Sequence, residues 1–125
     1  QDRIVGCFGI TEPFPGVQGV AWALLAAGIG RAHLALTRFA ARELANSGLN
    51  RVEVLARCAA TPEHFDHAAA MRWALSASRI TPECRWAGLL GLRPAHVLHR
   101  YGAASETHML FEWFGVPAIA AREAA

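Results

Sequence analysis

Two glycines and an arginine form the strongest candidate for chemistry in this chain. Gly28, Gly30 and Arg31 stand between the apolar run "VAWALLAA" and a segment with helical periodicity. Glycine lets the backbone approach a phosphate closely, and the free N–H groups at a helix N-terminus attract anions. The same spacing also suits a plain strand-to-helix turn that needs a positive φ. The pattern therefore predicts either a phosphate-binding loop, with Ile29 in its middle and Arg31 adding charge, or a simple turn.

The histidines raise the question of a metal site, because two pairs have i, i+3 spacing. His64 and His67 lie in "HFDH", and His96 and His99 lie in "HVLH". On a helix the first pair would share one side and supply half of a zinc site. The second pair lies in a predicted strand, where such residues point to opposite faces. We expect no metal site, since nothing in the sequence brings four ligands together.

The three cysteines, Cys7, Cys58 and Cys84, are odd in number and lack CxxC spacing. This argues against a disulfide scaffold and a zinc ribbon, and we expect all three to be reduced and buried. Cys58 ends a predicted strand beside a helix start, which could lower its pKa. Because no histidine base can be placed next to it, a buried small residue is the favoured interpretation.

Composition favours one soluble globular domain over residues 1–125. Of these 125 residues, 54% are apolar and 18% are charged, which is enough apolar material for a core. All basic residues are arginines, scattered along a chain of net charge +2, so nucleic-acid binding is not favoured. The longest apolar stretch, residues 19–29, is about half the length of a membrane-spanning helix. We expect a cytoplasmic protein that does not enter a membrane.

Periodicity and turn residues predict two hairpins that flank a helical region. Gly48 is expected to end the first helix, and Thr61 and Thr81, each followed by proline and glutamate, are expected to cap the next two. The first strand–helix–strand succession suggests a βαβ crossover. The predicted strands are 3–10, 17–26, 51–58, 95–102 and 106–115, and the predicted helices are 31–47, 62–77 and 82–92.

This order of elements, with the stretch "GIGRAHLALTRFAARELANSGLNRVEVLARC" and the segment "RWAGLLGLRP", resembles the C-terminal two-thirds of the GNAT N-acetyltransferase fold. The likeness covers roughly residues 3–113 and is closer still to small GNAT-like proteins of tailed bacteriophages and prophages. It implies an α+β fold: a mixed, mainly antiparallel sheet flanked by helices, with the N-terminal part of the fold truncated. It also implies that residues 28–31 would hold the diphosphate of acetyl-CoA, with the pantetheine arm in a gap between the strands "VAWALLA" and "RVEVLARC".

The family's motif is only partly present. Leu25 stands where the family has glutamine or arginine, and the strand and helices that shape the acceptor site are largely missing. Acetyl transfer needs a base for the ammonium proton and an acid for the departing thiolate. Tyr101 and Glu53 are the candidates, although Tyr101 lies in a predicted hairpin rather than in the helix where the family usually places its tyrosine.

Two functions follow from the resemblance. The first is a phage or prophage GNAT-like protein with degenerate or absent catalysis, acting in virion assembly or host interaction and located in the bacterial cytoplasm or the virion. The alternative is an acetyl-CoA-dependent N-acetyltransferase acting on an unidentified amine. The incomplete motif favours the first. The partners expected are phage structural proteins, host proteins, or a second copy of the chain that covers exposed sheet.

Overall fold

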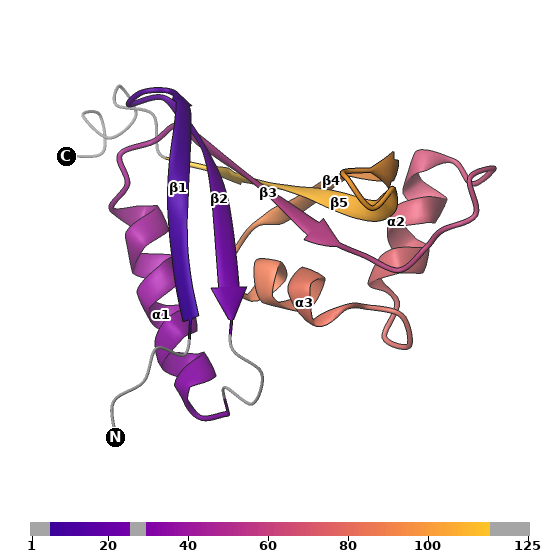
Figure 1. Ribbon diagram of the computed structural model, residues 1–125, viewed down its shortest axis with the longest axis horizontal. Coiled ribbons are helices and arrows are strands. Elements are labelled where there is room, and N and C mark those ends of the chain that lie inside the picture. The colour runs from indigo at the N-terminus through magenta and orange to yellow at the C-terminus, as the bar shows by residue number, and fades with distance from the viewer. Residues whose placement is uncertain (1–5, 26–29, 116–125) are drawn as a thin grey trace. The chain divides into compact units, whose positions relative to one another are not determined.

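The computed structural model describes residues 6–25 and 30–115, and it has the predicted α+β architecture (Figure 1). Five strands form one sheet in the order β1-β2-β3-β5-β4, and both hairpins within it are antiparallel. The elements in chain order are β1 (Gly6–Phe14), β2 (Gln18–Leu25), α1 (Ala32–Ala45), β3 (Arg51–Arg57), α2 (His67–Leu75), α3 (Pro82–Leu89), β4 (Arg93–Tyr101) and β5 (Glu106–Phe114).

The chain divides into two compact units. Unit 1 comprises residues 1–53 and 113–125, and unit 2 comprises residues 54–112. Strands β3 and β5 contribute residues to both units. A single domain stays a prediction.

In unit 1, β1 and β2 form the predicted hairpin, closed by a turn in which Gly16 has φ +74°. The register pairs Phe8 with Ala23, and Phe8 packs edge-to-face on Phe39 of α1 with ring centroids 5.4 Å apart. One face of the hairpin therefore meets α1. Cys7 pairs with Leu24 on the opposite face.

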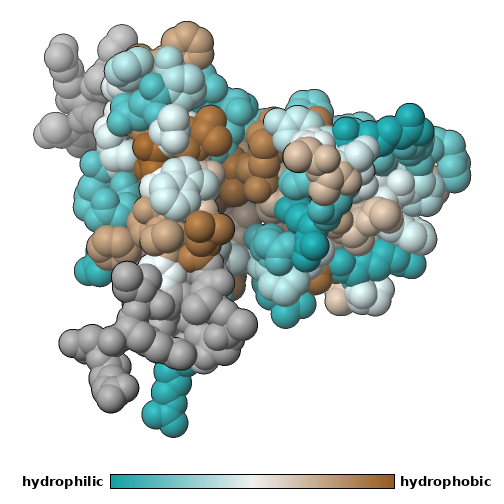
Figure 2. All heavy atoms as spheres, in the orientation of Figure 1, coloured by the Kyte–Doolittle hydropathy of each residue, from teal (hydrophilic) through white to brown (hydrophobic). Residues whose placement is uncertain are grey.

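That opposite face of the hairpin is exposed. Leu24 is 68% exposed and Trp22, which pairs with Gly9, is 47% exposed. Figure 2 shows apolar side chains gathered over β1 and β2. Cys7 is exposed as well, so its predicted burial is wrong. Alternation identified the two faces but not which of them is covered.

Helix α1 connects neighbouring strands. The carbonyl oxygen of Val17, just before β2, accepts hydrogen bonds from the N–H groups of Asn50 (2.8 Å) and Arg51 (3.3 Å) at the start of β3. The two strands therefore begin at the same end and run parallel, which confirms the βαβ crossover. Ala40 and Leu44 of α1 are buried, and Gly48, with φ +73°, follows the helix as predicted.

In unit 2, the Thr81 prediction is correct and the Thr61 prediction is wrong. Helix α3 starts after Thr81, whose Oγ1 accepts a hydrogen bond from the Cys84 N–H (3.2 Å). Residues 62–65 form only a turn, and α2 starts after Asp66, whose Oδ1 accepts from the Ala69 N–H (2.8 Å). Thr61 itself is 7% exposed, and its hydroxyl has no hydrogen-bond partner among the described residues.

The closing hairpin, β4 and β5, carries the core of unit 2. Met109 and Phe111 are 0% and 1% exposed, so the face of β5 that they share is buried in the core. Its turn holds Gly102 at φ +79° and Ser105 at φ +54°. The other buried apolar residues of this unit are Ala56, Cys58, Ala70, Ala74, Cys84, Ala87 and Leu92. Across the described residues, each helix is too short or too polar to cross a membrane.

Candidate functional site

The start of α1 has no side-chain cap. Gly30 is exposed at φ +55°, and Arg31 occupies the N-cap position without a capping hydrogen bond. The first turn contains no acidic residue. Gly28 and Ile29, the other two predicted contacts, lie outside the described residues. The structure therefore places Gly30 and Arg31 together at a helix N-terminus, as the sequence predicted.

An arginine at this position is unusual, because the N-terminal end of a helix carries partial positive charge. The other two helices within residues 30–115 are preceded by Asp66 and Thr81, whose side chains accept hydrogen bonds from first-turn N–H groups. At α1 a bound anion would do what those side chains do, and Arg31 would then contribute attraction rather than repulsion. An exposed glycine, a cation and an uncapped helix end are features that an anion-binding site would use.

Glu53, a candidate base, already has partners. Its Oε1 accepts hydrogen bonds from Arg51 Nε (3.0 Å) and Gln18 Nε2 (3.3 Å) within unit 1. Arg51 also lies 5.4 Å from the ring centroid of Phe114. Glu53 thus joins β2 and β3 in a part-buried polar contact, and its catalytic role stays a prediction.

Tyr101, the candidate acid, lies at the end of β4 in unit 2. It is 41% exposed and packs edge-to-face on His108, with ring centroids 5.6 Å apart. Among the described residues, His108 is the one titratable side chain in a ring contact with this partly exposed phenol. Its catalytic role stays a prediction.

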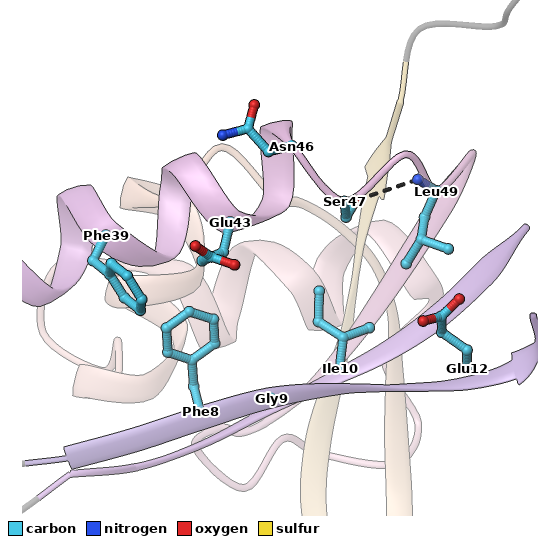
Figure 3. Close-up of a pocket in the computed structure, with 9 residues that line it drawn as sticks. All are labelled: Phe8, Gly9, Ile10, Glu12, Phe39, Glu43, Asn46, Ser47 and Leu49. Atoms are coloured by element: carbon cyan, nitrogen blue, oxygen red, sulfur yellow. Dashed lines mark hydrogen bonds between the residues drawn. The ribbon is translucent and has the colours of Figure 1, made fainter. Parts of the chain in front are cut away.

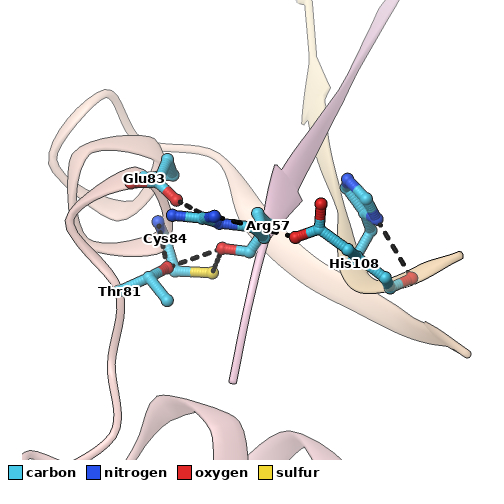
Figure 4. Close-up of polar contacts among 6 residues, drawn as sticks. Arg57, Thr81, Glu83, Cys84 and His108 are labelled. Carbon is cyan, nitrogen blue, oxygen red and sulfur yellow. Dashed lines mark hydrogen bonds and ion pairs between the residues drawn. The ribbon is translucent and has the colours of Figure 1, made fainter. Parts of the chain in front are cut away.

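Arg57, which the sequence did not single out, is the centre of a polar cluster in unit 2 (Figure 4). Its carbonyl oxygen accepts hydrogen bonds from Thr81 Oγ1 (2.7 Å) and Cys84 Sγ (3.7 Å). Its guanidinium lies between Glu83 (3.5 Å) and Glu106 (3.7 Å). These contacts attach the start of α3 to the end of β3 and to β5. An arginine at a strand end gives no sequence signal for such a role.

Burial makes Cys58 and Cys84 poor nucleophiles. Desolvation, with a smaller contribution from Cys84, raises the pKa of Cys58 to about 11. Burial likewise raises the pKa of Cys84 above its ordinary value. The helix predicted to start near Cys58 starts only after Asp66, so the predicted lowering of its pKa is wrong. The favoured interpretation of a buried small residue is confirmed.

The histidines are arranged differently from the sequence prediction. His64 lies before α2 and His67 is its first residue, so the two do not share a helix face. His67 instead packs on His96 of β4, with ring centroids 4.7 Å apart. Among the described residues, no group of three histidine, cysteine or acidic side chains is placed to hold a metal ion.

Comparison with solved structures finds a GNAT-like arrangement. The fold is similar to the crystal structure of an acetyltransferase (GNAT family) from Bacillus anthracis, with a TM-score of 0.56 and 14% identity. The match covers 88% of this chain and 58% of the other. No family model matches the sequence, and no curated protein matches it. The chain has a GNAT-like fold, and it spans a little over half the length of this structural neighbour.

Proposed function

We propose that this chain is an acyl-CoA-binding protein of the GNAT type, with residues 28–31 at the diphosphate. The observation that carries the proposal is the start of α1, where Gly30 and Arg31 leave the helix end without a side-chain cap. The similar fold of a GNAT-family acetyltransferase supports it. Acetyl-CoA, when bound, supplies an activated acetyl thioester.

Gly30 and Arg31 have distinct parts in this proposal. The exposed backbone of Gly30 lets an anion approach the helix axis without a Cβ in the way. Arg31 supplies a cation that holds phosphate oxygens through a pair of N–H groups. Neither role requires a proton transfer, so binding should change little with pH between 6 and 8.

Calorimetric titration tests the binding step. We expect acetyl-CoA and free CoA to bind, and pantetheine, which lacks the diphosphate, to bind at least tenfold more weakly. Arg31→Glu should weaken CoA binding at least tenfold, because it places a carboxylate beside the phosphates. Failure to bind CoA, or equal binding of pantetheine, would contradict the proposal.

A matched pair of glycine variants distinguishes a direct effect on CoA binding from the effect of backbone strain on folding. Gly30 and Gly48 both have positive φ, at the two ends of α1. Alanine at either position costs about 1 kcal/mol of stability through its backbone conformation. Only Gly30→Ala should weaken CoA binding, and an equal loss in Gly48→Ala would assign the effect to folding.

The second candidate is a non-catalytic role in virion assembly or host interaction, as the likeness to phage proteins implies. The exposed apolar side chains of the β1–β2 hairpin favour it, because such a surface suits a protein partner. Incubation with acetyl-CoA and a panel of amines separates the two candidates. Release of free thiol that depends on the amine supports an acetyltransferase, whereas CoA binding without thiol release supports the non-catalytic role.

A further inference from the structure

Strand β1 lies at the edge of the sheet that the described residues form. It is the first strand in the sheet order, and β2 is its one paired neighbour among the described residues. In an antiparallel pair, alternate residues of an edge strand point their N–H and C=O groups away from the partner. Charge and proline are the usual means of blocking such an edge. In β1 they occur only at its end, as Glu12 and Pro13, and residues 6–11 carry neither.

A groove runs beside this edge, between β1 and α1, with a volume of about 330 Å³ (Figure 3). This is the lower end of the range for pockets that hold small ligands or side chains. All of its lining residues belong to unit 1. They are Phe8, Gly9, Ile10, Glu12, Phe39, Glu43, Asn46, Ser47 and Leu49.

The groove combines an aromatic wall with negative charge. Phe8 and Phe39 stack edge-to-face at 5.4 Å, one from each side of the groove. Glu43 is exposed, and its carboxylate forms no hydrogen bond or ion pair with any described residue. Glu12 uses one oxygen to accept a hydrogen bond from the Gly16 N–H (2.8 Å). With two carboxylates and no basic residue in the lining, the groove suits a cationic head on an apolar stem.

We propose that β1 accepts an extended peptide from another protein as an additional strand, and that basic side chains of this peptide enter the groove. Backbone hydrogen bonds to the β1 edge would supply affinity, and alternate side chains would supply specificity. The stem of an arginine would lie across Phe8 and Phe39, with its guanidinium at Glu43. This inference is independent of CoA binding at the start of α1.

The charge of the groove argues against a second copy of the chain as the occupant. A copy paired through its own β1 would present the side chains of residues 6–14, in which the one charged residue is Glu12. That pairing would bring a carboxylate, not a cation, to the edge beside Glu43. A partner strand that alternates apolar and basic residues fits better.

The test uses the full chain and synthetic octapeptides. The probe is an acetylated, amidated peptide that alternates arginine and valine, and binding is measured by fluorescence anisotropy and by hydrogen exchange. We expect binding, with new protection confined to amides of β1. A peptide with glutamate in place of arginine should bind at least tenfold more weakly. Methylation of alternate backbone nitrogens on the edge that faces β1 should abolish binding.

Protein variants test the groove separately. Glu43→Gln keeps the shape and removes the charge, and it should weaken binding of the arginine peptide about fivefold. Glu83→Gln is the matched control, because it makes the same change in unit 2 outside the groove, and it should leave binding unchanged. Equal binding by the N-methylated peptide, or by Glu43→Gln, would overturn the proposal. So would light scattering that shows a dimer whose β1 amides are already protected.

Discussion

The two units differ in how completely helix ends are capped, strands are paired and apolar side chains are buried. In unit 2, both helices start with side-chain caps, Arg57 ties a strand to its neighbours, and β5 buries Met109 and Phe111. In unit 1, α1 starts without a side-chain cap, and β1 is an edge strand of the sheet that the described residues form. An uncapped helix or an unpaired strand edge departs from what local folding preferences favour, and such departures are expected at functional sites. Both of our proposals accordingly lie in unit 1.

Exposure of large apolar side chains follows the same division. Leu55, Leu89 and Tyr101 are the exposed ones described in unit 2. Unit 1 exposes a longer series, comprising Phe14, Val17, Trp22, Leu24, Leu34, Phe39 and Phe114. A contiguous exposed apolar patch is a common place for another molecule to bind.

The largest expected effect compares one buried and one exposed apolar residue. Phe111→Ala should lower the free energy of unfolding by about 3–5 kcal/mol, because it empties a core site in unit 2. Leu24→Ala on the open face of unit 1 should change it by less than about 0.5 kcal/mol. Urea denaturation measures both. Similar losses would show that the hairpin face is covered in solution.

The helix starts give the next effect. Asp66→Ala should lower stability by about 1 kcal/mol through loss of its cap. Arg31→Glu should instead raise stability by about 0.5 kcal/mol, because it improves the interaction with the helix dipole while it removes CoA binding. A gain in stability with a loss of CoA binding would show that Arg31 serves binding, whereas Asp66 serves folding. A destabilised Arg31→Glu would mean that Arg31 serves folding.

The cap predictions show where sequence reasoning succeeds and fails. Thr-Pro-Glu occurs at residues 61–63 and at residues 81–83, and it starts a helix at the second place alone. Near the first, Asp66 supplies a competing cap, and a helix from there buries Ala70 and Ala74 one turn apart. Local capping patterns propose a start, but burial of the helix face decides between alternatives.

Most of the fold and part of the site could be predicted from the sequence. Turn residues and the alternation of apolar and polar residues predicted both hairpins, and the glycines predicted where α1 starts. The role of Arg57 and the position of Glu43 in a groove could not be predicted, because both depend on which elements pack beside them. The exposure of Cys7 could not be predicted either, since alternation does not say which face is covered.

The cysteines of the two units should differ in thiol reactivity. Cys7 in unit 1 is exposed and should react with a maleimide in the native protein, whereas Cys58 and Cys84 in unit 2 should react only on unfolding. Because burial raises the pKa of Cys58 from 9.0 to about 11, the unfolded chain loses this proton first as pH rises. Stability should therefore fall between pH 9 and pH 11, by on the order of 1 kcal/mol. Native-state labelling of Cys58 at pH 8 would contradict this.

The smallest effect concerns a surface ion pair in unit 2. Arg100 and Glu63 form a two-point contact with N–O distances of 2.8 and 2.7 Å, and both side chains are largely exposed. A double-mutant cycle with Glu63→Gln and Arg100→Gln should give a coupling below about 1 kcal/mol that decreases with salt. A larger coupling would mean that this contact organises the loop before α2.

The central claim is that the uncapped start of α1 is an anion site, and backbone amide NMR tests it most directly. On titration with CoA, the amide signals of residues 30–33 should shift most, whereas those of Ala69 and Cys84, which are bonded to Asp66 and Thr81, should stay in place. Shifts at all three helix starts, or none at α1, would contradict the claim.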